Sequence, residues 1–244
     1  YPTGRLLDEA GVDIVLVGDS LGMVVLGFPD TTHVTLDHML HHVEATARGV
    51  KNALLVGDMP IHSYDTVEQA VQSAKKLFLA GADAVKLEGG AAQAGNIRAI
   101  VEAGIPVVGH IGLLPQKVLE EGGYKIKGKS SAEEEALVRD VEAVAEAGAC
   151  AVVVEGVTPH AARQVTVHSS IPTLGIGSGS HTCDGDVVVI HDLVGAFPWF
   201  IPAFVKPRAD VAGSMTAAVK EWMEDCYTAV SYTHLRAHET RSNL

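Results

Sequence analysis

The sequence is poor in cysteine, poor in positive charge and free of long apolar runs. Its three cysteines, Cys150, Cys183 and Cys226, are widely spaced and form no CxxC pair. This pattern excludes a cysteine zinc site and favours a reducing cytoplasm. The 18 Lys and Arg residues are outnumbered by 30 Asp and Glu residues, and the net charge of −12 argues against nucleic acid or an anionic membrane as a partner. No apolar run approaches the roughly 20 residues of a membrane span, and no signal peptide is visible.

Hydrophobic residues make up 47% of the 244 residues, which is enough for one domain with a full core. Short apolar runs alternate with helical patterns, and they predict strands at 14–17, 54–57, 84–87, 106–110, 151–154, 173–176 and 187–190. Alternation at this pitch is typical of parallel β/α architecture. We expect a (β/α)₈ barrel that lacks its first strand, because seven strands are visible and the chain starts at Tyr1 within a loop–helix transition. The alternative is a Rossmann sheet, although no GxGxxG follows the first visible strand.

Three consecutive strands are each followed or ended by an acidic residue. Asp19, Asp58 and Glu88 occupy these positions, about one βα unit apart. Ligands of parallel α/β proteins bind at this edge of the sheet. Carboxylates that converge there repel one another unless a cation lies between them, and ligands that are all oxygen favour Mg²⁺. The alternative interpretation is that each acid caps a helix or faces water.

Other polar residues occur at the same strand ends. Lys86 alternates with Glu88, so both should point to the same side of their strand and form either a structural ion pair or an anion site. Glu155 follows three valines, a setting that suits a general base, although a solvated loop acid is equally consistent. His110 is either a hydrogen-bonded structural residue or a functional one. Together these residues predict a Mg²⁺-dependent barrel enzyme that chelates an oxo acid and moves a proton beside its carbonyl.

The segment from Leu114 to Ser131 is long for a simple connection and is predicted to be a lid or flap over the site. Its alternating lysines, Lys125, Lys127 and Lys129, are interpreted as a solvated loop. If they are functional, they would meet a polyanionic cosubstrate.

Several motifs resemble, in order, the ketopantoate hydroxymethyltransferase (3-methyl-2-oxobutanoate hydroxymethyltransferase) family. They are Val17-Gly-Asp-Ser-Leu-Gly-Met23, Gly57-Asp-Met-Pro60, Val85-Lys-Leu-Glu-Gly-Gly90, Gly109-His-Ile-Gly-Leu-Leu-Pro-Gln116, Gly122-Gly-Tyr-Lys125 and Gly175-Ile-Gly-Ser-Gly179. The resemblance runs from Tyr1 to about Tyr227 and implies a (β/α)₈ TIM barrel of the phosphoenolpyruvate/pyruvate superfamily. It also implies transfer of a hydroxymethyl group from 5,10-methylenetetrahydrofolate to 3-methyl-2-oxobutanoate, which forms 2-dehydropantoate in pantothenate and coenzyme A biosynthesis.

The same resemblance implies roles for individual residues and a state of assembly. By motif, Asp19, Asp58 and Glu88 are expected to be ligands of Mg²⁺. The expected substrate contacts are Asp19, Ser20, Asp58 and Lys86, the expected proton acceptor is Glu155, and His110 is a further candidate. Relatives of this kind form large cytoplasmic homo-oligomers, decamers in the bacterial branch.

The chain also departs from the family pattern. Relatives carry a strand before the position of Tyr1, so residues 1–227 are expected to be a single, N-terminally truncated barrel domain. Lys206-Pro-Arg-Ala-Asp210 replaces the usual Lys-Arg-Tyr-Ala-Asp, and residues 228–244 are expected to be an artefactual, disordered tail. Two alternatives therefore stay open: an incomplete, inactive fragment of that enzyme, or another Mg²⁺-dependent 2-oxo acid lyase of the superfamily.

Overall fold

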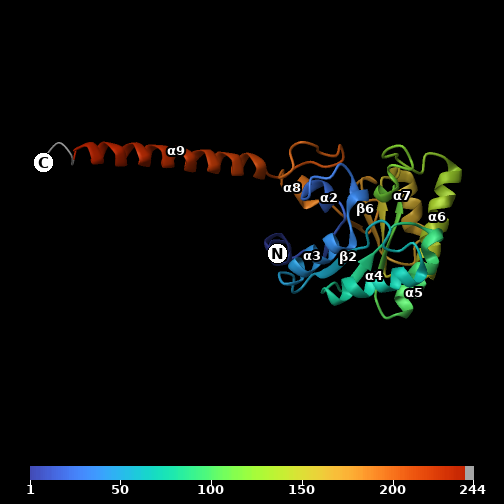
Figure 1. Ribbon diagram of the computed structural model, residues 1–244. Helices are drawn as coiled ribbons and strands as arrows, with labels where there is room; N and C mark the ends of the chain where they lie inside the picture. The colour runs from blue at the N-terminus through green and yellow to red at the C-terminus, as the bar shows by residue number, and fades with distance from the viewer. Residues whose placement is uncertain (240–244) are drawn as a thin grey trace. The chain divides into compact units, whose positions relative to one another are not determined.

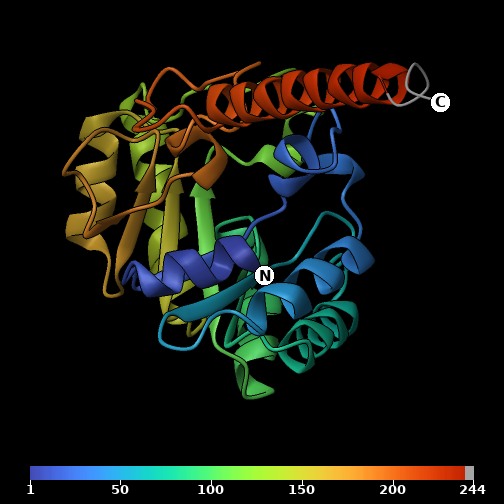
Figure 2. The ribbon, with the colours of Figure 1, turned by 90° about the vertical axis from the view of Figure 1, so that its left-hand side faces the viewer.

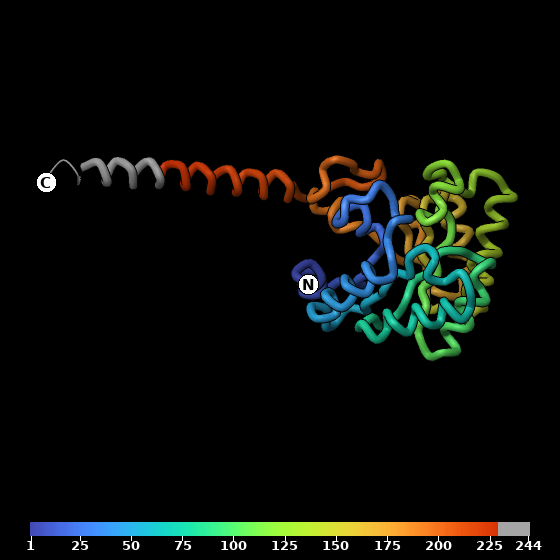
Figure 3. Tube along the Cα trace, in the orientation of Figure 1, coloured from blue at the N-terminus to red at the C-terminus, as the bar shows by residue number. Residues whose placement is uncertain are grey.

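Seven parallel strands form one sheet in the computed structural model, which describes residues 1–239. Each strand pairs with the next one along the chain, in the order β1 to β7. Figure 3 traces the path of the chain, coloured by residue number from blue at the N-terminus. The strands are β1 (Ile14–Val17), β2 (Leu54–Asp58), β3 (Ala84–Lys86), β4 (Val107–Gly112), β5 (Ala151–Glu155), β6 (Thr173–Ile176) and β7 (Gly185–Asp186). The first six match the strands expected from the sequence to within two residues at either end.

Helices alternate with these strands and lie outside the curved sheet (Figures 1 and 2). The main ones are α1 (Pro2–Glu9), α3 (Leu36–Ala47), α4 (Val67–Leu79), α5 (Ala94–Glu102), α6 (Ser131–Glu146) and α7 (Pro159–His168), with short turns α2 (Leu21–Val24), η1 (Thr31–His33), η2 (Ala91–Gln93) and η3 (Pro115–Lys117) between them. Four of the helices begin at a hydroxyl side chain that accepts a hydrogen bond from a main-chain N–H in the first turn: Thr35, Thr66, Ser130 and Thr158. These caps fix where each helix starts after its strand.

The strands are apolar on both faces, which explains their unbroken apolar runs. One large cluster fills the space between the sheet and the helices and includes Leu55, Val85 and Val107. A second, smaller cluster lies on the other face of the strands and includes Val56 and Val108. Because successive side chains of a strand point to opposite faces, the two clusters mark the outside and the inside of the curved sheet.

Gly109 in β4 allows helix α6 to lie close to the sheet. A Cβ atom at this position would lie 2.4 Å from Cγ1 of Val144, which is fully buried on α6. Val144 is β-branched and has little rotamer freedom to move away. The absence of a side chain at Gly109 is therefore a packing requirement of this strand–helix contact.

The prediction of a strand at 187–190 is wrong. Pairing with β6 covers Gly185–Asp186 and ends where the Val187 N–H donates to the carbonyl of Gly175. The main-chain N–H groups of Asp192 and Leu193 then donate to the carbonyl of Val189, so helix α8 (Ile190–Leu193) begins where the strand was expected to end. A four-residue apolar run is compatible with either structure, and here the helical turn satisfies its backbone.

The sequence from Phe204 to Val230 predicts a helix, but in the structure this helix begins later. Helix α9 (Val211–Glu239) starts after Pro207, and the Asp210 carboxylate accepts a hydrogen bond from the main-chain N–H of Gly213 in its first turn. The second compact unit of the chain begins at Val188 and contains α8 and α9, whereas the first, Tyr1–Val187, contains the whole sheet. Residues 240–244 of the expected tail lie outside the described residues, and the bounds of the expected single domain stay a prediction.

We predict that Gly109→Ala lowers the free energy of unfolding by about 1–3 kcal/mol, the usual cost of an added methyl group in a packed core. The cost should shrink in a Val144→Ala background, because the atom that clashes is then absent. The control is Gly95→Ala on α5, where an added Cβ has no neighbour within 4 Å among the described residues, and it should not destabilise. Urea denaturation of the four variants tests this. An equal cost of Gly109→Ala in both backgrounds would contradict the packing explanation.

Candidate active site at the carboxyl ends of the strands

Four charged side chains expected at the strand ends are buried together. Asp58 and Lys86 are the last residues of β2 and β3 and are directly paired in the sheet register. Asp19 follows β1 after one glycine, and Glu88 lies two residues beyond Lys86. Each of the four is exposed by 4% or less. Asp58 and Lys86 stand two positions after Val56 and Ala84 of the inner cluster, so they point to the inside of the sheet.

Lys86 and Asp58 form the central ion pair, with 2.6 Å between Lys86 Nζ and Asp58 Oδ1. The other oxygen of Asp58 accepts a hydrogen bond from the main-chain N–H of Asp19, at 3.1 Å. Burial alone would lower the pKa of Lys86, but the carboxylates of Asp58, Glu88 and Asp19 together raise it above its ordinary value. Lys86 therefore stays a cation in this buried position.

A single lysine does not balance three carboxyl groups. Burial, followed by repulsion from Asp58, raises the pKa of Asp19 to about 7, although Lys86 acts in the opposite direction. Burial also raises the pKa of Glu88 well above its ordinary value, and Asp19 and Asp58 add to that shift while Lys86 opposes it. The site consequently favours either a bound proton or an additional positive charge.

The chemistry of the donor set fits a hard divalent cation. Glu88 Oε1 is buried with no hydrogen-bond partner among the described residues, and Asp58 Oδ1 has none there beyond its ion pair with Lys86. Free carboxylate oxygens of this kind are the ligands that Mg²⁺ takes. Within residues 1–239, however, no three His, Cys, Asp or Glu side chains are already arranged around one metal position. The assignment of Asp19, Asp58 and Glu88 as ligands stays a prediction.

His110 connects this charged group to Glu155. His110 lies in β4 and is 2% exposed, with its Nδ1 at 3.4 Å from Lys86 Nζ and its Nε2 at 3.3 Å from Glu155 Oε2. The same Nδ1 lies 3.6 Å from Glu88 Oε1, and Nε2 has no hydrogen-bond partner among the described residues. Because the lysine ammonium can only donate, Nδ1 accepts from it, and a neutral ring then carries its proton on Nε2. The side chain of Glu155 is 22% exposed, so it is the most accessible acid of the group.

The two remaining expectations concern Ser20 and the flap. Ser20 is half-buried next to Asp19 and precedes helix α2, where its side chain makes no capping hydrogen bond; its role stays a prediction. The end of the flap is attached beside Glu155, since Lys127 N–H donates to the carbonyl of Gly156 at 2.9 Å. The ammonium groups of Lys125 and Lys127 contact Glu121, so these two lysines are not simply solvated.

Sequence reasoning missed two neutral side chains, Gln116 and Tyr64. Gln116 is 3% exposed and hydrogen-bonded to Asp19, Met59 and Tyr64. Burial raises the pKa of Tyr64, so its hydroxyl stays protonated. The only available signal for Gln116 was its place at the end of a recognised motif, and Tyr64 lies in a loop with no periodic pattern.

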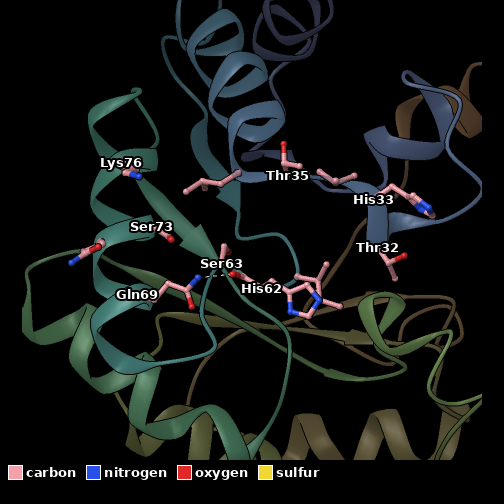
Figure 4. A pocket seen from close by; sticks show the side chains of 12 residues that line it. Thr32, His33, Thr35, His62, Ser63, Gln69, Ser73 and Lys76 are labelled. Carbon is pink, nitrogen blue, oxygen red and sulfur yellow. Dashed lines mark hydrogen bonds between the residues drawn. The ribbon is translucent and has the colours of Figure 1, made fainter.

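A separate hollow of about 480 Å³ lies between α4 and the segment that leads into α3 (Figure 4). Gln69, Ser73 and Lys76 line it from the side of α4, and Thr32 and His33 line it from the opposite side. It contains none of the expected site residues. The charged group at the strand ends is therefore a distinct feature of the molecule.

The chain is similar throughout to one family of enzymes. The family model described as ketopantoate hydroxymethyltransferase matches residues 1–230. The 3-methyl-2-oxobutanoate hydroxymethyltransferase of Ignicoccus hospitalis is 50% identical over 226 residues, which cover 92% of this chain and 85% of that protein.

Solved structures with much lower sequence identity share the fold. The structure of 2,3-dimethylmalate lyase, a member of the PEP mutase/isocitrate lyase superfamily, has a TM-score of 0.58 and 19% identity, with 92% of this chain and 78% of that chain covered. Phosphonopyruvate hydrolase in complex with oxalate and Mg²⁺ has a TM-score of 0.55 and 17% identity, with 71% and 63% covered. These similarities and the sequential parallel sheet confirm the expected barrel fold class. Among the described residues, no helix combines the length and apolar character needed to cross a membrane.

We predict that the metal-free protein loses stability as the pH rises from about 4 to about 7. The pKa of Asp19 is about 7 in the folded chain and about 3.9 in an unfolded one, so the folded state binds more protons between these values. The stability that this proton supplies is complete below about pH 4 and is lost as the pH rises through 7. Asp19→Asn should flatten this dependence, because it removes a loss on the order of a few kcal/mol across the window.

Chemical denaturation in EDTA at several pH values measures this dependence. The control is Asp13→Asn, at an exposed position just before β1, and it should keep the wild-type slope. An unchanged slope in Asp19→Asn would show that Asp19 is already ionised in the folded protein.

Proposed function

The chain belongs to the ketopantoate hydroxymethyltransferase family, and we propose that it transfers a hydroxymethyl group from 5,10-methylenetetrahydrofolate to 3-methyl-2-oxobutanoate. The observation that carries this proposal is the buried group of Asp19, Asp58, Lys86 and Glu88 at the ends of β1, β2 and β3. Such a group can bind a small oxo acid and stabilise negative charge at its carbonyl.

We propose Mg²⁺ as the metal, held by Asp19, Asp58 and Glu88. The unpartnered oxygen of Glu88 and the raised pKa values of Asp19 and Glu88 support a cation at this position. A structural neighbour in complex with oxalate and Mg²⁺ supports it as well. When bound, a divalent ion polarises a carbonyl oxygen and stabilises the negative charge that develops there, by several kcal/mol.

Lys86 and Ser20 are proposed to bind the substrate together with Asp19 and Asp58. The Lys86 ammonium is permanently charged and fixed by Asp58, so it supplies a preorganised positive charge for the oxo acid. Ser20 follows Asp19 after β1, and its hydroxyl makes no capping hydrogen bond to helix α2. These contacts would orient the substrate carbonyl toward the charged group.

Glu155 is proposed as the base. It would take the proton from C3 of the oxo acid, and the electron pair of the broken C–H bond would move toward the carbonyl. C3 would then form a bond to the one-carbon unit of the folate cosubstrate. Water would supply the hydroxyl oxygen, both bonds from that carbon to the folate nitrogens would break, and protons would return to the nitrogens to give tetrahydrofolate. His110 Nε2 lies 3.3 Å from Glu155 Oε2, although it has no hydrogen-bond partner among the described residues. The partial exposure of Glu155 lets it exchange the proton afterwards.

We further propose that the enzyme is a cytoplasmic homo-oligomer, with a decamer as the expected state. All three cysteines are free, which is consistent with a reducing compartment. Helix α9 carries exposed apolar side chains at helical spacing, namely Met215, Val219, Trp222 and Met223, and exposed apolar patches of this kind mark protein contacts.

We predict that Asp58→Ala abolishes metal-dependent exchange of the C3 proton of 3-methyl-2-oxobutanoate, because it removes a ligand and the partner of Lys86. Exchange in deuterium oxide, followed by NMR with and without EDTA, is the measurement. Asp65→Ala is the matched control, since Asp65 is exposed in the loop after β2. Asp58→Asn keeps the volume of the side chain and separates loss of charge from loss of packing.

Metal-independent exchange by the folded wild-type protein would contradict the metal role. Faster turnover of another oxo acid in the same assay would contradict the proposed substrate.

We predict that Glu155→Gln retains substrate binding but slows C3 exchange by about 10²–10⁴-fold, the usual contribution of a positioned base. The amide keeps the shape of the side chain and removes its basicity. Glu146→Gln, at an exposed position at the end of α6, serves as the control. Exchange near the wild-type rate in Glu155→Gln would assign the base to a different group.

A further inference from the structure

Gln116 is a neutral side chain that contacts several strand-end loops at once. It lies in η3, in the turn that follows β4, and is almost fully buried. Its side chain contacts Asp19 after β1, together with Met59 and Tyr64 after β2. Its main chain contacts Glu88 after β3.

The orientation of the Gln116 amide follows from its partners. Its Nε2 lies 2.8 Å from Asp19 Oδ2 and 3.0 Å from the carbonyl oxygen of Met59. A main-chain carbonyl can only accept a hydrogen bond, so this end of the amide must be the NH₂ group. The opposite end, Oε1, then accepts a hydrogen bond from the hydroxyl of Tyr64. All three hydrogen bonds agree with one orientation of the amide.

Tyr64 is itself held by a further hydrogen bond. Its carbonyl accepts from Asn96 Nδ2 at 2.8 Å, and the same Asn96 group donates to Gln93 Oε1 at 2.7 Å. A neutral hydrogen-bond network thus leads from the start of α5 through Tyr64 to Gln116 and Asp19. Fully satisfied networks of this kind rigidify the groups that they connect.

Gln116 also forms a hydrogen bond with one oxygen atom of each of two carboxylates. Its side chain binds Oδ2 of Asp19, and its main-chain N–H donates to Oε2 of Glu88 at 3.1 Å. The other oxygen of Glu88, Oε1, has no hydrogen-bond partner among the described residues. One residue therefore binds one oxygen of each acid and does not bind the other. Glu88 Oε1 lies 3.6 Å from His110 Nδ1.

We propose that Gln116 is a positioning residue of the metal site: it holds Asp19 and Glu88 so that one oxygen of each faces the ion. This inference rests on the proposed function, because it takes Asp19 and Glu88 to be ligands. A neutral amide suits the task, since it donates to Asp19 without adding negative charge. A glutamate at this position would place a third carboxylate against Asp19 and the Met59 carbonyl.

Gln116→Met tests the proposal, because methionine keeps the volume and removes the side-chain hydrogen bonds. The probe is Mn²⁺, titrated into metal-free protein and followed by electron paramagnetic resonance, with a thermal melt of each metal-free variant. We expect the Kd for Mn²⁺ to rise by about 10–100-fold, the usual effect of removing a partner of a metal ligand. The matched control is Gln72→Met at an exposed position of α4, which should keep the wild-type Kd.

A second variant, Tyr64→Phe, leaves Gln116 in place and removes only the hydroxyl that fixes its amide. It should raise the Kd in the same direction by a smaller factor. A merely structural role would lower the melting temperature and the folded fraction but leave the Kd of the folded protein unchanged.

The outcomes separate this inference from the function on which it rests. Wild-type protein that binds no Mn²⁺ overturns both. Wild-type binding together with an unchanged Kd in Gln116→Met overturns the positioning role alone. If Gln116→Met does not fold, the Kd of Tyr64→Phe decides, and an unchanged value overturns the proposal.

Discussion

The buried ion pair between Lys86 and Asp58 is the interaction on which the site depends. It places a permanent cation among three carboxyl groups, all of them almost inaccessible to water. Removing charges from water is costly, and one lysine compensates for only part of that cost. Burial and the uncompensated negative charge therefore raise the pKa values of Asp19 and Glu88. The stability of this region thus depends on whether a proton or a cation binds there. Such a dependence is expected of a ligand site rather than of a structural ion pair.

The sheet accounts for the convergence of these charges. The inner cluster contains Val56, Ala84, Val108 and Val153, and the residues two positions further along the same strands are Asp58, Lys86, His110 and Glu155. Asp58 pairs directly with Lys86, whereas the register moves by two residues at each of the next two strand pairs, so that Lys86 pairs with Val108 and His110 pairs with Val153. On each of these strands the inside of the sheet changes from apolar to charged over two residues. Packing that fixes the strands, such as the contact of Gly109 with Val144, therefore also fixes the site.

Most of this arrangement could be predicted from sequence because it depends on local order. A short apolar run followed by an acid identifies both a strand and the end at which its ligand lies, and Asp19, Asp58, Glu88 and Glu155 were found in this way. The run at 187–190 failed because an isolated apolar stretch does not distinguish a strand from a helical turn. Gln116 could not be assigned a role, because its partners Asp19 and Tyr64 are 97 and 52 residues away in the chain. A neutral side chain in an irregular loop has no pattern that indicates such contacts.

In the proposed chemistry, binding of the metal and the oxo acid requires a buried site, whereas the base requires access to water. Strand β4 lies between the residues proposed for these two tasks. The groups that would bind the metal and the oxo acid are buried at the ends of β1, β2 and β3, where electrostatic interactions are strong. The proposed base lies at the end of β5 and is partly exposed, as a group must be if it is to release the proton that it takes. His110 on β4 contacts Lys86 through one ring nitrogen and Glu155 through the other. Because His110 is itself buried, it separates the buried charged group from the accessible base.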